Sequence, residues 1–188
     1  MWIFARNRIE FKHKLHWMDE YILECYISSI ENAKLTLDTI VKHNETTILV
    51  ARTLLCALDV STGRIRRCDS VGVKADMQTE TPEIKIKFTD TNFVPTVLVD
   101  SVTSCSTDID YCNHTNNISY IRYILNQYKG SQIQQQPITA IEIQYINQSF
   151  EGDKLEIYRY LSDKFSIKSN NKSVANCIIE FNCEKSNN

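Results

Sequence analysis

The side chains best suited to chemistry lie in one polar stretch, residues 108–117, which reads Asp-Ile-Asp-Tyr-Cys-Asn-His-Thr-Asn-Asn. Asp110 and His114 are four residues apart in a turn that runs into a predicted helix, so both side chains can reach one pocket mouth. A carboxylate there can act as a base for water or as a nucleophile. An imidazole can orient the water or protonate a leaving group. This spacing predicts hydrolytic chemistry at residues 110–114.

Ordinary structural roles compete with these assignments. Asp108 or Asp110 could cap the helix, and His114 could be a satisfied residue at the helix start. Cys112 lies between the two candidates and could be a nucleophile, but a reactive cysteine needs a lowered pKa. A half-buried, unreactive thiol is the competing interpretation of Cys112.

A helix is predicted to follow this stretch. Asn116 and Asn117 either pin the turn into the helix or contact a ligand. The helix is expected over residues 115–128, with Gly130 ending it. Its apolar positions recur at helical spacing: Ile118, Ile121, Ile124, Leu125 and Tyr128. Tyr120 lies on the same helix, either in the core or against a ligand.

Strands are predicted on both sides of this helix. In the second half, a short strand at residues 96–99 precedes it, and strand pairs at 139–143 with 155–161 and at 164–167 with 174–181 follow it. In the first half, alternating segments at residues 9–13, 21–27, 33–41 and 47–60 predict an antiparallel meander. The pattern predicts an α+β fold in which the helix lies across an antiparallel sheet.

The two halves also resemble each other. Arg8-Ile-Glu-Phe11 matches Ala140-Ile-Glu-Ile143 at a spacing that suits a duplicated domain. We expect an incomplete first repeat at residues 1–68, because nothing precedes its four strands. Residues 69–94, interrupted by Pro82, are expected to be a linker, and residues 95–188 a complete second repeat.

Composition narrows the classes of function. Hydrophobic residues make up 43%, charged residues 23%, and the formal net charge is −2. This balance is typical of a globular protein and offers no basic surface for nucleic acid. No apolar run reaches the roughly 20 residues that span a bilayer, so no membrane partner is expected. The seven cysteines form no C-x-x-C pair, which favours reduced thiols and a cytoplasmic location. No residue cluster predicts a metal site or a cofactor.

Residues 108–120 resemble the D-x-D-x-N-x-H-V-N-N-x-x-Y signature of the acyl-acyl-carrier-protein thioesterases of plants and bacteria. The beginning of the chain, Met1-Trp-Ile-Phe-Ala-Arg6, is similar to that family's first-domain strands. Gln144-Tyr-Ile-Asn-Gln-Ser149 looks like its E-Y-x-x-E-C segment. The resemblance covers almost the whole chain. It implies a tandem (double) hot-dog fold that lacks the first strand and helix of the first repeat.

The resemblance also implies roles for individual residues. The family's catalytic Asp and His fall on Asp110 and His114, its Asn falls on Cys112, and its Glu falls on Gln148. Ser149 stands where plant members have a Cys. The catalytic set is therefore Asp110, Cys112, His114 and Gln148. The expected substrate-contacting residues are Asn113, Asn116, Asn117, Tyr120 and Ser149.

The implied activity is hydrolysis of fatty acyl-acyl-carrier-protein thioesters in fatty acid biosynthesis, with the carrier protein as partner and no cofactor. A simpler acyl-CoA thioesterase is an alternative, because the looser D-x-x-x-H-x-N block occurs there too. A non-catalytic module that binds acyl thioesters or dimerises is the rival from another class, which Cys112 and Gln148 favour. A homodimer is possible in each case.

Overall fold

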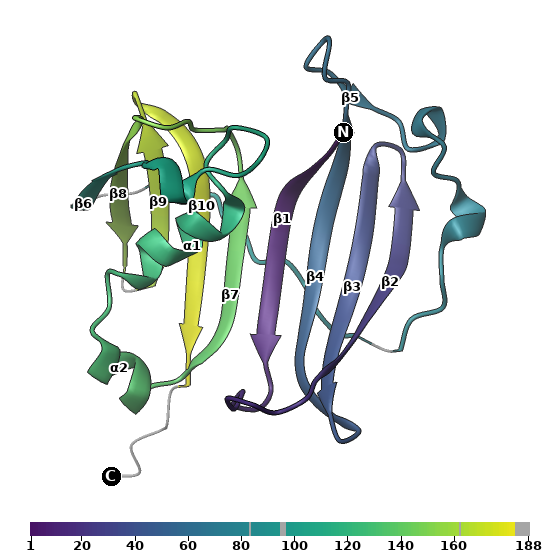
Figure 1. Cartoon of the computed structure of the whole chain (residues 1–188), viewed down its shortest axis with the longest axis horizontal. Coiled ribbons are helices and arrows are strands. Elements are labelled where there is room, and N and C mark those ends of the chain that lie inside the picture. The colour runs from purple at the N-terminus through teal and green to yellow at the C-terminus, as the bar shows by residue number, and fades with distance from the viewer. Residues whose placement is uncertain (83, 95–96, 162, 183–188) are drawn as a thin grey trace. The chain divides into compact units, whose positions relative to one another are not determined.

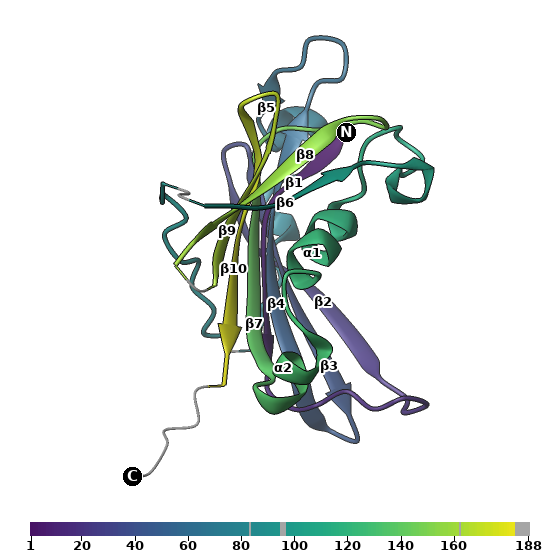
Figure 2. The same cartoon turned by 90° about the vertical axis from the view of Figure 1, so that its left-hand side faces the viewer.

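In a computed structural model of the chain, residues 1–82, 84–94, 97–161 and 163–182 are described. The chain divides into two compact units, Met1–Phe88 and Thr89–Asn188. The division falls within residues 69–94, the segment expected to link two domains. Each unit contains an antiparallel sheet (Figures 1 and 2). Among the described residues, no helix is long and apolar enough to cross a membrane.

Unit 1 is a sheet of long strands in the order β2-β3-β4-β1, with β5 paired to β4. Asn44 and Glu45 both have positive φ values, 47° and 64°, so they form the two-residue turn that joins β3 and β4 with the twist of a hairpin. Two 3-10 turns follow the strands. Among its described residues, unit 1 has no α-helix. Its elements are β1 (Trp2–Phe11), β2 (Ile22–Glu31), β3 (Lys34–His43), β4 (Thr46–Leu58), β5 (Ile65–Arg66), η1 (Asp69–Val71) and η2 (Ala75–Met77).

One face of the unit 1 sheet is covered by the segment that follows η2. Ile86 packs there with Ile40 and Val50 in a buried cluster. The guanidinium of Arg52 donates to both carboxylate oxygens of Asp38, at 2.7 and 2.6 Å, and to the carbonyl oxygen of Ile86 at 2.6 Å. This ion pair, with Asp38 buried and Arg52 partly exposed, therefore fastens Ile86 to the sheet of unit 1.

The opposite face of unit 1 is predominantly apolar. Because cross-strand partners lie on the same face, the strand register places Leu23, Val41, Leu49 and Phe11 in one row across four strands. A second row consists of Ile30, Leu35, Leu55 and Phe4. We call this surface the apolar face of unit 1. Leu23 and Phe4 are exposed on it.

Unit 2 has the order β7-β10-β9-β8-β6, again antiparallel throughout. Asn170 and Asn171, both with positive φ, form the turn between β9 and β10. The elements are β6 (Val97–Thr103), η3 (Ser106–Asp108), α1 (Asn117–Leu125), α2 (Gly130–Gln135), β7 (Ile138–Tyr145), β8 (Lys154–Tyr160), β9 (Lys164–Ser169) and β10 (Lys172–Phe181).

Helix α1 lies across the unit 2 sheet, as predicted (Figures 1 and 2). Tyr120 packs against Tyr145 of β7, with ring centroids 6.3 Å apart. Tyr128, just after the helix, contacts the rings of Phe165 and Phe181 at 5.8 and 5.1 Å. The sheet beneath is fully buried at Ile143, Leu155, Ile157, Phe165 and Ile167.

The helix is shorter than predicted, and its buried face was predicted only in part. The helix does not extend over residues 115–128, and Gly130 begins the short helix α2 instead of ending a long one. Of the predicted apolar positions, Ile124 and Tyr128 are buried, but Ile118 is 64% exposed. Tyr120, Tyr123 and Ile124 follow the i, i+3, i+4 spacing of one helix face, and all three are buried.

The predicted pairing of residues 139–143 with 155–161 was also wrong. Strand β7 pairs with β10, and β8 pairs with β9 and β6. The β8-β9-β10 segment folds as consecutive hairpins, so its last strand, and not its first, returns to β7. The predicted pairing of residues 164–167 with 174–181 is confirmed.

Candidate active site

The loop between β6 and α1 carries the predicted reactive stretch, and Asp108 anchors this loop. The Asp108 side chain is buried and accepts hydrogen bonds from the main-chain N–H of Cys105 at 2.9 Å and from its thiol at 3.0 Å. Arg122 of α1 forms an ion pair with the other carboxylate oxygen. Burial alone would raise the pKa of Asp108, but the Cys105 hydrogen bonds and the Arg122 charge lower it to about 2. Asp108 therefore holds the loop against α1 as an anion at neutral pH.

Asp110 closes a tight turn with its own side chain. Its Oδ1 accepts the main-chain N–H groups of Cys112, at 2.8 Å, and of His114, at 3.4 Å. Its N–H donates to the carbonyl oxygen of His114 at 2.9 Å. Asn113 has a φ of 63°, a left-handed conformation that Asn tolerates better than most residues. The turn fixes Oδ1, and no described residue donates a hydrogen bond to Oδ2, which leaves that oxygen available for chemistry.

Hydrogen bonds between Thr115 and Ser149 join the segment that contains His114 to the segment that contains Gln148. The N–H of Thr115 donates to the carbonyl oxygen of Ser149 at 2.8 Å, and the Ser149 hydroxyl donates to Thr115 Oγ1 at 2.8 Å. Both side chains are buried. Each immediately follows a predicted catalytic residue, His114 in one segment and Gln148 in the other. His114 also packs edge-on against Phe150, with ring centroids 5.3 Å apart.

The predicted substrate-contacting residues have different surroundings. Asn116 caps α1, because its Oδ1 accepts the N–H of Ile118 at 3.0 Å. Asn117 is the first residue of the helix. Asn113 is exposed in the turn. Tyr120 and Ser149 are buried, with their hydroxyl oxygens 2.8 Å apart. Gln148 is exposed, and Cys112 is partly exposed.

The main-chain amides near the start of α1, which could in principle face a developing oxyanion, mostly donate to other groups. The N–H of His114 donates to Asp110, that of Thr115 to Ser149 and that of Asn116 to the carbonyl oxygen of Asp108. The N–H groups of Ile118 and Ser119, in the first helical turn, donate to the side-chain and main-chain oxygens of Asn116. An oxyanion at this loop would depend on the Asn117 N–H or on side-chain donors such as the Gln148 amide.

Four contributors to this arrangement were not among the predicted site residues: Ser104, Thr115, Phe150 and Arg122. Thr115 could have been suspected from its place beside His114, and Phe150 from its place beside Ser149. Neither Ser104 nor Arg122 has a signal in the sequence, because their side-chain partners, Thr115 and Asp108, are brought to them only by the fold of the loop.

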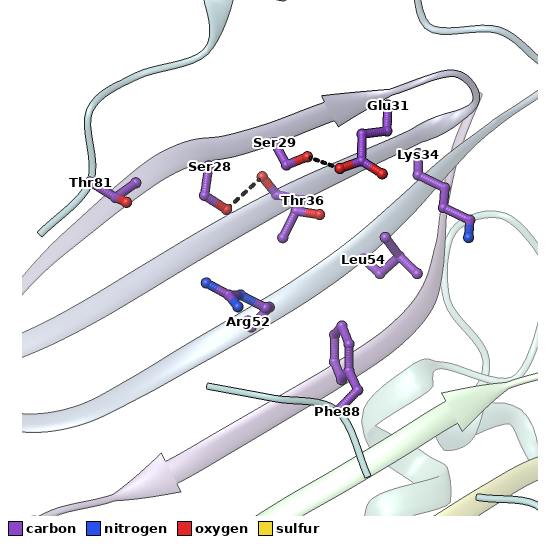
Figure 3. A pocket seen from close by; sticks show the side chains of 9 residues that line it. All are labelled: Ser28, Ser29, Glu31, Lys34, Thr36, Arg52, Leu54, Thr81 and Phe88. Carbon is purple, nitrogen blue, oxygen red and sulfur yellow. Dashed lines mark hydrogen bonds between the residues drawn. The ribbon is translucent and has the colours of Figure 1, made fainter. Parts of the chain in front are cut away.

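Unit 1 contains a cavity of about 460 Å³ that includes none of the predicted site residues (Figure 3). Its lining is mostly polar, with Leu54 and Phe88 as the apolar members. The cation of Arg52 is neutralised by Asp38, and Lys34 and Glu31 carry opposite charges. A fatty acyl chain needs an apolar slot, so this cavity does not suit one. The remaining lining residues are Ser28, Ser29, Thr36 and Thr81.

Within the described ranges, no group of three or more His, Cys, Asp or Glu side chains is placed to hold a metal ion.

The comparison with protein families matches the half of the chain that contains the Asp110 turn. Residues 98–186 match the family model of the acyl-ACP thioesterase C-terminal domain. A comparison with curated proteins found no match.

Several solved structures have a similar fold. An acyl-ACP thioesterase from Bacteroides thetaiotaomicron superimposes with a TM-score of 0.75 at 21% identity, over 96% of this chain and 76% of that one. A 12:0-ACP thioesterase from Umbellularia californica gives 0.75 at 16% identity, over 96% and 75%. A MaoC-like dehydratase gives 0.58 at 11% identity, over 96% and 75%. These likenesses establish a hot-dog-like antiparallel sheet.

Proposed function

We propose that the chain, whose residues 98–186 match the acyl-ACP thioesterase C-terminal domain, belongs to the acyl-ACP thioesterase family and hydrolyses fatty acyl thioesters to a free fatty acid and a thiol. The observation that carries the proposal is the Asp110 turn. One carboxylate oxygen is held by main-chain N–H groups, the other faces no described partner, and His114 closes the same turn. This turn lies within the residues that match the family model.

In the proposed reaction, Asp110 acts on water. Oδ2 accepts a proton as the water oxygen attacks the thioester carbonyl carbon. The tetrahedral intermediate then collapses and the carbon–sulfur bond breaks. The leaving thiolate takes the proton back, either from Asp110 or through His114. The water supplies the new acid hydroxyl group and the thiol proton, and Asp110 is regenerated as a carboxylate. Direct attack by Asp110 on the carbonyl carbon is the alternative.

Gln148 has a different role from a glutamate at the same place. An amide cannot serve as a base, but its NH₂ group can donate to a developing oxyanion, where a carboxylate would repel it. The Thr115–Ser149 pair supports this role because it holds the neighbouring residues His114 and Gln148 in adjacent segments.

We propose acyl carrier protein as the carrier of the acyl group, in fatty acid biosynthesis in the cytoplasm. Acyl-CoA is the alternative carrier. The tandem hot-dog organisation, with an incomplete first repeat before residue 69 and a complete one after residue 94, belongs to the same proposal, as does assembly into a homodimer.

A non-catalytic acyl-thioester-binding module is the second candidate function. Cys112 and Gln148, which stand where the resemblance implies Asn and Glu, favour it. The two functions differ in turnover, so release of free thiol separates them.

The deciding experiment measures thiol release from acyl-carrier-protein and acyl-CoA substrates of several chain lengths. Asp110→Asn should remove nearly all activity, because it keeps the size of the side chain but abolishes its basicity. Asn can still accept from the two N–H groups, so the turn should remain folded. His114→Ala should lower kcat by about 10²–10⁴-fold, the usual contribution of a positioned acid or base.

Full activity in folded Asp110→Asn would exclude the mechanism. Wild-type protein that binds acyl thioesters without releasing thiol would establish the binding module instead. Faster turnover with acyl-CoA than with the carrier-protein substrate would exclude acyl carrier protein as the preferred carrier.

A further inference from the structure

Four buried hydroxyl groups form a chain beneath the candidate active site. They belong to Ser104, Thr115, Tyr120 and Ser149, each at most 4% exposed. Tyr120 Oη lies 2.8 Å from Ser149 Oγ, Ser149 Oγ 2.8 Å from Thr115 Oγ1, and Thr115 Oγ1 2.9 Å from Ser104 Oγ. The chain joins α1, the loop after β7, the turn before α1 and the loop after β6.

The donor in each hydrogen bond between these hydroxyl groups can be assigned by counting their protons. Each hydroxyl donates one proton. Ser149 donates its proton to Thr115, so the bond between Tyr120 and Ser149 must use the proton of Tyr120. The polarity therefore runs from Tyr120 through Ser149 to Thr115. Hydrogen bonds aligned in this way strengthen one another, and removing one buried member leaves its partners unsatisfied.

We propose that Ser149 is a positioning residue, which sets the placement of His114 through its paired hydrogen bonds with the neighbouring Thr115. The inference rests on the proposed function. Thr115 lies one residue after His114, so the two hydrogen bonds between Thr115 and Ser149 hold the main chain beside His114 against the segment after β7, where His114 packs against Phe150.

The position of Ser149 excludes a direct chemical role. The side chain is 0% exposed and its proton is given to Thr115. A nucleophile or substrate contact needs access to the acyl group, which this hydroxyl lacks. Its effect must pass through the residues it holds.

The test compares Ser149→Ala with Ser166→Ala in the full chain. Ser166 is a buried serine of β9 in the same unit, outside the hydroxyl chain, and loses the same atom. We expect Ser149→Ala to lower kcat by roughly 10–100-fold, the effect of displacing a catalytic group by a fraction of an ångström to one ångström. KM should stay within about threefold, and Ser166→Ala should retain wild-type kcat.

Two further variants keep the test independent of folding losses. Tyr120→Phe retains the ring against Tyr145 and removes only the first donor, so it should lower kcat less than Ser149→Ala. Ser149→Cys restores a weak donor and should recover part of the rate.

A double-variant test addresses the hydrogen bond itself. The losses of Thr115→Val and Ser149→Ala should not multiply in the double variant, because both remove the same hydrogen bond.

A second readout does not require turnover. The ring resonances of His114 in NMR spectra should move in Ser149→Ala and stay in place in Ser166→Ala. If Ser149→Ala leaves both kcat and the His114 resonances at wild-type values, Ser149 does not position His114. Failure of the proposed function has a different signature, namely wild-type protein that releases no thiol, and the resonances would then still decide whether Ser149 holds His114.

Discussion

At the residue scale, the candidate site separates side chains that can react from side chains that hold them. One oxygen of Asp110 accepts the N–H groups of Cys112 and His114, and the other accepts no hydrogen bond from the described residues. Asp108, two residues earlier, is buried and paired with Arg122. Two aspartates of the same motif therefore have different functions, one proposed for catalysis and one structural, because only one of them meets a cation.

Cys112 is the residue whose role most affects the mechanism. Its main chain is part of the Asp110 turn, and its side chain is only partly exposed. We expect Cys112→Ala to leave kcat within about threefold of wild type, because the proposed reaction passes through Asp110. Cys112→Asn should match or exceed the wild-type rate by supplying an additional amide donor.

The measurement is thiol release before and after treatment with an alkylating reagent. Cys25→Ala is the control, since Cys25 is an exposed thiol of unit 1. Loss of activity in Cys112→Ala, together with inactivation that parallels alkylation of Cys112, would make this cysteine the nucleophile and contradict the role of Asp110.

At the element scale, Asp108 ties the reactive loop to α1, and this tie should depend on pH. The folded-state pKa of Asp108 is about 2, below the value of about 4 for an unfolded chain. The stability from the ionised carboxylate is therefore fully present above about pH 4 and is lost as the pH falls towards 2. We expect Asp108→Asn to reduce the free energy of unfolding by roughly 2 kcal/mol at pH 7.

Urea denaturation at pH 7 and at pH 2.5 measures this effect. The difference between wild type and Asp108→Asn should shrink at the lower pH, because the wild-type carboxylate is then largely protonated in the unfolded chain and partly protonated in the folded one. Asp76→Asn, on the exposed turn η2, should change stability at neither pH. A difference for Asp108→Asn that is independent of pH would mean that shape, and not charge, holds the loop.

Elements also show what the sequence can and cannot determine. The alternating strands and the helix after the reactive stretch could be predicted, because period and turn chemistry are local. The pairing of β7 with β10 could not, since it depends on how three hairpin strands return to the sheet. The buried face of α1 was predicted only in part, at Ile124 but not at Ile118, because a tyrosine such as Tyr120 suits either a core or a ligand. The Thr115–Ser149 pair joins residues 34 positions apart. The sequence alone does not distinguish these buried hydroxyl side chains from exposed ones, so the pair could not be predicted.

At the scale of the whole molecule, the two units differ in how their sheets are covered. In unit 2, α1 packs over the sheet (Figure 1). In unit 1, among its described residues, no α-helix is available for the apolar face. Leu23 is 63% exposed there, and Phe4 48%. Soluble monomers rarely expose contiguous apolar patches above a few hundred Å².

We therefore expect the 188-residue chain to self-associate through the apolar face of unit 1. Leu23→Lys should weaken the association at least about tenfold, because burying one leucine contributes on the order of 1.5–3 kcal/mol and 1.4 kcal/mol corresponds to a factor of ten. Val60→Lys is the matched control. Val60 is equally apolar and 73% exposed, but it follows β4 and lies outside the two rows that define the face. Sedimentation velocity over a range of concentrations measures both variants. A wild-type chain that stays monomeric at high concentration, or a Val60→Lys effect as large as that of Leu23→Lys, would show that the apolar face of unit 1 is not the contact surface.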